Sequence, residues 1–360
     1  MAKKFILTAG GSGGHVFPAE ALAKVLTSKG HRVDFITTKK SKNFKASFKD
    51  SDEYHIFAAG YAGKNIFRKL VGLFLLGLGV LQSLVILLKI RPDAVVGFGG
   101  YGSFPACFAA IMLRIPLIIN EQNAVLGSAN RILAPKSKLI ALSFPKTSLL
   151  PDNIKTAYTG LPVRPSILAL HGRGYPEIKD EYRLLIFGGS QGATVLSKVV
   201  PEALVSLPEA FRKKLRIAQQ CRAADMEMVS RTYSGSGIDV EVSTFFDNMP
   251  ERLEKAYLVI CRAGASTIGE LSASGRPSIM VPIANSPGNH QFENAKSLES
   301  VGGCILCLEK DFDKDWLAFK IQELFNNPKL LSNAAANAKT WGKTDSPELL
   351  AKAVLEITGE

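Results

Sequence analysis

The chain has 360 residues, and at roughly 150 residues per domain this length predicts two compact units rather than one small binding module. Hydrophobic residues make up 46% and charged residues 21%, a composition that excludes intrinsic disorder. Lysine and arginine total 44 against 32 acidic residues, and the net charge of +12 predicts an anionic partner. Composition alone leaves nucleic acid, acidic lipid and a phosphorylated small molecule open.

Cysteine usage and the start of the chain both indicate a cytoplasmic protein. The five cysteines form an odd set without a plausible disulfide framework, which is typical of a reducing compartment. Lys3 and Lys4 precede only three apolar residues before the glycines begin, far short of a secretory signal.

One unit, an apolar run followed by a glycine turn and a helical pattern, occurs four times. The copies span 3–26, 91–112, 182–200 and 256–275. Each run, rich in Val, Ile, Leu or Phe, predicts a buried parallel strand, and the small-residue turn lets a helix start close behind it. Two copies lie in each half. We therefore expect an α/β fold of two Rossmann-like domains whose glycine loops converge on one cleft.

The first glycine loop precedes a helix, where free backbone N–H groups and the helix dipole can hold a phosphate. Its glycines stand at 10, 11, 13 and 14, which is not the dinucleotide spacing, and Asp34 precedes the next strand instead of ending it. Close packing of helix on strand explains these glycines equally well. His15 follows the loop directly and is either a group aimed into the cleft or a capping or exposed side chain.

An apolar run from Leu70 to Leu88, with Gln82 and Ser83 as its strongly polar members, is long enough to span a bilayer. Basic residues bracket it at positions 64, 68, 69, 89 and 91. Spanning would put parts of one α/β domain on opposite sides of a membrane. Insertion of one face of a helix into a membrane surface keeps the domain whole and is favoured, and burial as an ordinary core helix stays open.

Polar side chains follow a predicted strand at 116–120. Glu121, Gln122 and Asn123 stand at its carboxyl end, where ligands of such sheets bind, although polar residues after a strand are often simply loop. Prolines and a glycine at 159–165 mark the joint between the halves. We assign 1–160 to an N-terminal domain, 161–345 to a C-terminal domain and 346–360 to a terminal helix, whose packing partner periodicity leaves open.

The second half carries two further site candidates. Ser190 and Gln191 add side-chain donors to the glycine loop at 188–192, which favours a binding role there. Glu270 matches a capping box with Thr267, and on spacing alone this is a better explanation than a grip on ribose hydroxyls.

Two metal-like patterns are discounted. Asp50 and Asp52 lie in a lysine-rich stretch without a preceding buried strand, and Cys304 and Cys307 lie in an apolar run without a second cysteine pair. We expect no metal site.

Seven motifs in order are similar to those of the MurG family: GGSGGH at 10–15, GFGGYGS at 97–103, EQN at 121–123, LPVR at 161–164, GGSQGA at 188–193, CRAGASTIGEL at 261–271 and HQFENA at 290–295. These are UDP-N-acetylglucosamine (UDP-GlcNAc) transferases of bacterial peptidoglycan synthesis that convert lipid I to lipid II. The resemblance implies the GT-B fold, inversion at the anomeric carbon, and neither a metal ion nor a cofactor.

The resemblance also implies partners and a location. The partners are UDP-GlcNAc, lipid I and an anionic membrane surface, with cell-wall synthesis proteins as further candidates and no nucleic acid. The location is peripheral, at the cytoplasmic face of the plasma membrane.

Roles for single residues follow from the same resemblance. His15 is the first choice and Glu121 the second for the catalytic base. The acceptor side would comprise Gly13, Gly14, Tyr101, Gly102 and Asn123. The donor side would comprise Ser12, Gly13, Asn123, Arg164, Gly189, Ser190, Gln191, Arg262, Ala265, Glu270, His290 and Gln291. Among these, Ser190 and Gln191 would contact the diphosphate and Glu270 the ribose.

The chain departs from the family pattern at three places. Asn120 replaces the usual histidine before EQN, Leu161 replaces asparagine before PVR, and His290 replaces the first glutamine of an Asp-Arg-Gln-Gln run. Two rival functions stay open: a binder of sugar nucleotides or lipid diphosphates without turnover, and an enzyme of the same fold that glycosylates diacylglycerol.

Overall fold

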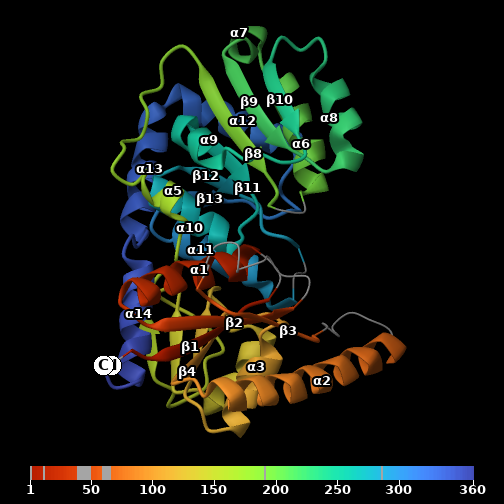
Figure 1. Cartoon of the computed structure of the whole chain (residues 1–360). Helices are drawn as coiled ribbons and strands as arrows, with labels where there is room; N and C mark the ends of the chain where they lie inside the picture. The colour runs from red at the N-terminus through yellow and green to blue at the C-terminus, as the bar shows by residue number, and fades with distance from the viewer. Residues whose placement is uncertain (1, 11–12, 39–49, 59–65, 190–191, 285–286) are drawn as a thin grey trace. The chain divides into compact units, whose positions relative to one another are not determined.

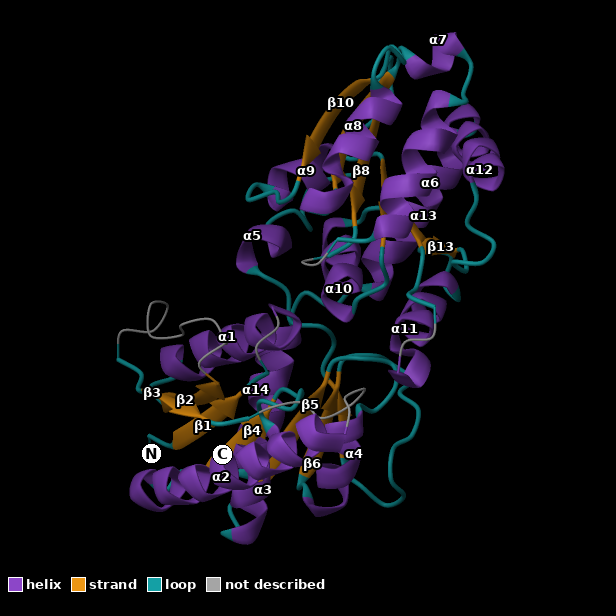
Figure 2. Cartoon of the chain, turned by 90° about the vertical axis from the view of Figure 1, so that its right-hand side faces the viewer, coloured by secondary structure: helices purple, strands orange, loops and turns teal. Residues whose placement is uncertain are grey.

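The computed structural model describes residues 2–10, 13–38, 50–58, 66–189, 192–284 and 287–360. It divides into two compact units, Met1–Val163 with Asp345–Glu360 and Arg164–Thr344. Each unit contains one parallel sheet flanked by helices, which confirms the α/β class (Figures 1 and 2).

The first unit is built on a seven-stranded parallel sheet in the order β3-β2-β1-β4-β5-β6-β7. Its strands are β1 (Lys4–Thr8), β2 (Arg32–Thr38), β3 (Glu53–Ile56), β4 (Ala94–Gly97), β5 (Leu117–Glu121), β6 (Leu139–Leu142) and β7 (Thr156–Tyr158). Its helices are α1 (Gly13–Ser28), α2 (Ile66–Ile90), α3 (Phe104–Met112), α4 (Ser128–Leu133), the 3-10 helix η2 (Ala134–Lys136) and α14 (Ser346–Ile357).

The central strands of this sheet are buried on both faces, as their continuous apolar runs predict. Phe5 and Leu7 of β1 pack toward α1 and α14, whereas Ile6 packs into the cluster on the opposite face. Asp34 lies inside β2 and is buried, so the expectation that it precedes the strand is wrong. Its carboxylate accepts a hydrogen bond from the backbone N–H of Asp52 at 3.0 Å, just before the edge strand β3.

The second unit is built on a six-stranded parallel sheet in the order β10-β9-β8-β11-β12-β13. Its strands are β8 (Tyr182–Phe187), β9 (Leu215–Gln220), β10 (Asp239–Ser243), β11 (Leu258–Cys261), β12 (Ser278–Met280) and β13 (Cys304–Leu306). Its helices are α5 (Pro165–Leu168), α6 (Thr194–Val205), α7 (Glu209–Arg212), α8 (Met226–Tyr233), α9 (Met249–Lys255), α10 (Ala265–Ser274), α11 (His290–Glu299), α12 (Lys314–Asn326) and α13 (Pro328–Trp341), with the 3-10 helices η3 (Ala223–Asp225) and η4 (Pro287–Asn289).

The terminal helix α14 belongs to the first unit, although it follows the second in sequence. It packs against α1, and Leu350 and Val354 are fully buried in the same cluster as Leu22 and Leu26 of α1. The chain thus crosses between the units twice.

The apolar run at 70–88 lies in α2, which packs on α3 and β3 along one side. Leu76 and Leu87 are buried on that side. A Cβ added at Gly79 would collide with the carbonyl oxygen of Phe57, so a glycine is needed where this backbone approaches the helix. The helix from Leu70 to Ile90 is long and apolar enough to cross a membrane, by length and composition only.

All five cysteines are free and buried. Burial raises the pKa of the Cys107 thiol to about 12 and that of Cys307 to about 11, which keeps both protonated at neutral pH.

Candidate active site

Two glycine loops meet at the carboxyl ends of the neighbouring strands β1 and β4. The N–H of Gly10 donates to the carbonyl of Gly99 at 3.1 Å, and a Cβ at Gly102 would lie 3.1 Å from Gly10 Cα. Gly99 and Gly100 have positive φ angles of 82° and 76°. The first-unit loops predicted for the acceptor therefore come together, and glycine permits both the close approach and the left-handed turn.

His15 lies two residues after the first described residue of α1, beside both loops. A Cβ added at Gly10 or Gly100 would lie 3.2 or 3.3 Å from its Cδ2. The ring Nδ1 lies 3.0 Å from Gln122 Oε1. Burial lowers the pKa of His15 below its ordinary value, against the opposing effects of Glu121 and of hydrogen bonds with Gln122 and Phe98. His15 is therefore neutral at neutral pH and able to accept a proton.

Both carboxylate oxygens of Glu121, the last residue of β5, accept hydrogen bonds from the segment that follows the strand. Oε1 accepts hydrogen bonds from the backbone and side-chain nitrogens of Asn123 at 3.0 and 3.2 Å. Oε2 accepts from Gly127 N at 2.9 Å and from Asn130 Nδ2 at 2.7 Å. These four donors occupy the lone pairs of the carboxylate oxygens. Of the two base candidates, this geometry favours His15.

The other acceptor candidates lie in the same loop cluster. Tyr101 is half-buried and Gly102 is buried in the turn before α3, and Asn123 is held by Glu121 at the end of β5. Gly13 and Gly14 open α1. Ser12 lies outside the described residues.

In the second unit, Arg164 and Glu270 form an ion pair. Arg164 donates from Nε and Nη2 to Glu270 Oε1 at 2.8 and 2.6 Å. Helix α10 begins at Ala265 with Gly264 as its N-cap, so Thr267 lies inside the helix and the capping box is wrong. Burial raises the pKa of Glu270, and the charge and hydrogen bonds of Arg164 oppose that shift. The pair fixes the carboxylate of Glu270, which lies near the middle of α10.

Arg262 and Gln291 organise the loop that follows β12. Arg262 Nη1 donates to the carbonyls of Val281 and Pro282 at 3.0 and 3.1 Å, and to Glu309 Oε2 at 3.1 Å. Gln291 Oε1 accepts the N–H of Ile283 at 3.1 Å. Both residues predicted for the donor therefore shape one loop, together with Glu309, which sequence reasoning missed because no local pattern marks it.

Of the remaining donor candidates, His290 opens α11 and its Nδ1 is buried without a hydrogen-bond partner in the described part of the chain. Ala265 opens α10, and Gly189 has a positive φ of 80° before α6. Ser190 and Gln191 lie outside the described residues, so their contact with the diphosphate stays a prediction. The single cleft on which the glycine loops of both units are expected to converge also stays a prediction.

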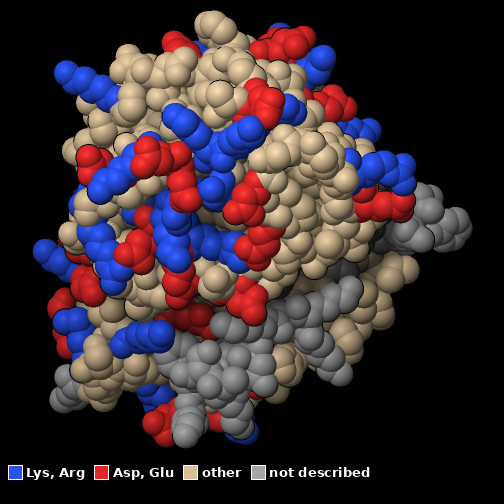
Figure 3. Space-filling view, turned by 90° about the horizontal axis from the view of Figure 1, so that it is seen from above, with Lys and Arg blue, Asp and Glu red and all other residues tan. Residues whose placement is uncertain are grey.

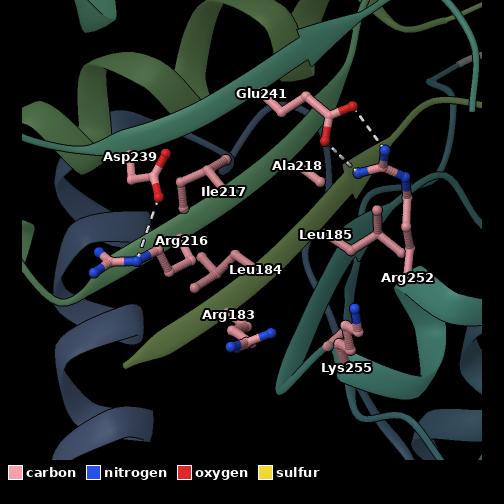
Figure 4. Close-up of a pocket in the computed structure, with 11 residues that line it drawn as sticks. Arg183, Leu184, Leu185, Arg216, Ile217, Ala218, Asp239, Glu241, Arg252 and Lys255 are labelled. Carbon is pink, nitrogen blue, oxygen red and sulfur yellow. Dashed lines mark hydrogen bonds and ion pairs between the residues drawn. The ribbon is translucent and has the colours of Figure 1, made fainter. Parts of the chain in front are cut away.

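A separate hollow of about 250 Å³ lies on the sheet of the second unit (Figure 4). It is lined by residues of β8, β9 and β10 and of the C-terminal end of α9, outside the glycine loops. Arg216 pairs with Asp239 at 3.4 Å, and Arg252 pairs with Glu241 at 2.7 Å. Figure 3 shows acidic and basic side chains interleaved over the top of this unit. Since its arginines already have carboxylate partners, this hollow is a poor diphosphate site.

Two parallel α/β units, with glycine loops at the carboxyl ends of their strands, have the architecture of the GT-B class, and the family matches identify a glycosyltransferase of that class. The glycosyltransferase family 28 N-terminal domain matches residues 5–142, and the family 28 C-terminal domain matches residues 183–350. The chain belongs to the MurG family within glycosyltransferase family 28.

The relatives are similar over nearly their whole length. The chain is 46% identical over 355 residues, 98% of its length and 96% of the relative's, to the UDP-N-acetylglucosamine--N-acetylmuramyl-(pentapeptide) pyrophosphoryl-undecaprenol N-acetylglucosamine transferase of Paramagnetospirillum magneticum. The enzyme of the same name from Rhodospirillum rubrum is 46% identical over 350 residues, 97% of this chain and 90% of that protein. The crystal structure of Acinetobacter baumannii MurG has a TM-score of 0.80 at 30% identity and covers 98% of this chain and 99% of that one.

Proposed function

We propose that the chain transfers N-acetylglucosamine from UDP-GlcNAc to the C4 hydroxyl of undecaprenyl-diphospho-N-acetylmuramoyl-pentapeptide, with inversion at the anomeric carbon. The choice of substrates is carried by the 46% identity, over 98% of the chain, to a relative named for this transfer. The mechanism is supported by the neutral imidazole of His15 at the junction of two glycine loops.

The reaction is a direct displacement. The acceptor C4 oxygen forms a bond to C1 of the sugar while the bond from C1 to the diphosphate oxygen breaks, and that electron pair leaves with UDP. The hydroxyl proton passes to Nε2 of His15, which acts as general base. A negatively charged leaving group is stabilised by backbone N–H groups at a helix N-terminus, which α6 and α10 both provide behind their loops.

The deciding experiment supplies purified protein with labelled UDP-GlcNAc, UDP-glucose or UDP-galactose and with either lipid I or diacylglycerol. We expect transfer only from UDP-GlcNAc to lipid I. Transfer to diacylglycerol would support the rival enzyme, and binding of UDP-GlcNAc without product would support the non-catalytic binder.

Replacing Glu270 with alanine is expected to weaken UDP-GlcNAc binding by about 1–3 kcal/mol, because ribose hydroxyls and Arg164 would both lose a charged partner. Calorimetric titration measures the affinity, and kcat at saturating donor is expected to change little. Glu241→Ala is the matched control, since Glu241 also pairs with an arginine of this unit, Arg252, outside the donor loops. An unchanged donor affinity together with a lower Tm would make the Arg164–Glu270 pair purely structural.

Full activity is expected to survive chelation. The proposed step uses a histidine base and helix N-termini, and Asp52, a member of the discounted aspartate pair, is bound to Arg32 at 2.9 Å. Initial rates with and without EDTA check this. A loss in EDTA that Mg²⁺ or Mn²⁺ restores would overturn the metal-free step.

We further propose that α2 docks the enzyme on the cytoplasmic membrane surface, where a polyprenyl acceptor resides. Phe74 and Val85 on α2 are 67% and 68% exposed. Further apolar residues along the same helix are also exposed. Lys89 and Arg91 are exposed at its C-terminal end and supply charge for acidic lipid. Leu76 and Leu87 are buried in the unit's own core, which supports insertion of one face rather than spanning.

A further inference from the structure

Gln122, directly after Glu121, is locked in one orientation. Its side chain is 4% exposed, and its Nε2 donates to the backbone carbonyl of Phe98 at 3.2 Å. A carbonyl oxygen can only accept, so the amide nitrogen must face Phe98 and Oε1 must face the other way. On that other side, Oε1 lies 3.0 Å from Nδ1 of His15.

This orientation determines which ring nitrogen of His15 carries the proton. Because Gln122 Oε1 is an acceptor without a hydrogen, the contact is a hydrogen bond only when Nδ1 of His15 is protonated. In the neutral ring, Nε2 then holds the free lone pair. Among the described residues, the Nε2 edge lies against the glycine backbone of the second loop, since a Cβ added at Gly100 would lie 3.3 Å from Nε2.

We propose that Gln122 is a positioning residue that fixes His15 in the tautomer protonated at Nδ1, so that Nε2 accepts the acceptor hydroxyl proton. The inference rests on the proposed function for the role of His15, but the tautomer itself is independent of that role. The chain of hydrogen bonds from Phe98 through Gln122 to His15 connects the β4 loop, the β5 loop and the start of α1.

Nitrogen NMR of ¹⁵N-histidine-labelled protein tests the tautomer directly. The spectrum is recorded above the pKa of His15, and its signals are assigned by difference from His15→Gln. We expect the Nδ1 signal of a pyrrole-type, protonated nitrogen and the Nε2 signal of a pyridine-type one. The reverse assignment, or an average of both tautomers, would overturn the proposal even if the enzyme is fully active.

Two variants test the contribution of Gln122. Gln122→Met removes donor and acceptor at similar volume and is expected to mix the tautomers and lower kcat about tenfold, the worth of one hydrogen bond, with little change in donor KM. Gln122→Glu keeps an acceptor for Nδ1 and is expected to retain the tautomer. Glu121 already raises the pKa of His15, and a second carboxylate at position 122 should raise it further. The acid limb of the kcat profile should therefore move to higher pH.

Gln219→Met is the matched control, because Gln219 is a fully buried glutamine of the second unit whose Oε1 accepts from Tyr233 at 2.7 Å. It should lower Tm without changing the His15 signals or the pH profile. If Gln122→Met keeps the wild-type tautomer and kcat, Gln122 is structural only. If His15→Gln retains full kcat while the wild-type tautomer is as expected, the proposed base fails and the tautomer assignment stands.

Discussion

Replacing His15 with glutamine is expected to lower kcat by about 10²–10⁴, the usual contribution of a positioned general base. Glutamine keeps a polar side chain next to Gln122 but has no basic nitrogen. Donor affinity should be unchanged. The described residues assigned to the donor alone all lie in the second unit, whereas His15 lies in the first. Steady-state kinetics with lipid I measure kcat, and calorimetry with UDP-GlcNAc measures donor affinity.

The pH dependence of the wild-type kcat should also reflect His15 as the base. A base must be deprotonated to act, and burial lowers the pKa of His15 below its ordinary 6.5. The acid limb of kcat should therefore lie below pH 6.5, with activity present above it and lost as the pH falls through it. His15→Gln should remove this limb.

Glu121→Gln separates the two base candidates. If Glu121 only folds its loop, the variant should lower Tm and raise acceptor KM, because the new amide donates where Asn123, Gly127 or Asn130 already donate. A loss of kcat as large as that of His15→Gln, with Tm and KM unchanged, would instead make Glu121 the base.

Replacing Phe74 and Val85 of α2 with serine is expected to weaken binding to acidic vesicles by about 100-fold or more. Insertion of each side chain is worth about 1.5–3 kcal/mol, and 1.4 kcal/mol is a tenfold change. Activity on a long-chain acceptor in vesicles should fall with binding. Turnover of a short-chain soluble acceptor should be spared.

Leu76→Ser is the matched control on the same helix, since Leu76 is 5% exposed and packs in the core. It should lower Tm and affect both acceptors equally. Lys89→Glu should weaken binding to acidic vesicles only, and the effect should fade above roughly 0.15 M salt, where the Debye length is about 8 Å. If the Phe74 and Val85 variant loses activity equally with both acceptors, this face of α2 does not dock on the membrane. Resistance of the wild type to high-salt and alkaline extraction would indicate a spanning helix.

Local sequence patterns were sufficient for the elements. Each of the four predicted units contains a strand, a glycine turn and a helix, as in β1 with α1 and β11 with α10. The terminal helix, predicted within 346–360, is observed as α14 at Ser346–Ile357. These predictions succeed because apolar runs, glycine turns and helical periodicity act over a few residues, within reach of a single sequence window.

Periodicity could not identify the exposed face of α2, because a run that is apolar on all sides has no polar stripe to mark it. Packing on α3 decides that face, so Leu76 is buried while its neighbour Phe74, two positions earlier, is exposed. A substitution chosen from the sequence would have mixed core and surface positions.

The sequence by itself determined the two α/β units, the glycine loops and the candidate residues, since these depend on local spacing and on a resemblance spread along the whole chain. Only the tertiary structure decided what those residues do. Glu270 meets Arg164 across 106 positions, and His15 meets Gln122 across 107. Such partners are brought together by parallel strands ending at one edge of a sheet and by helices packed on it, and no sequence window of a few residues contains both members of either pair.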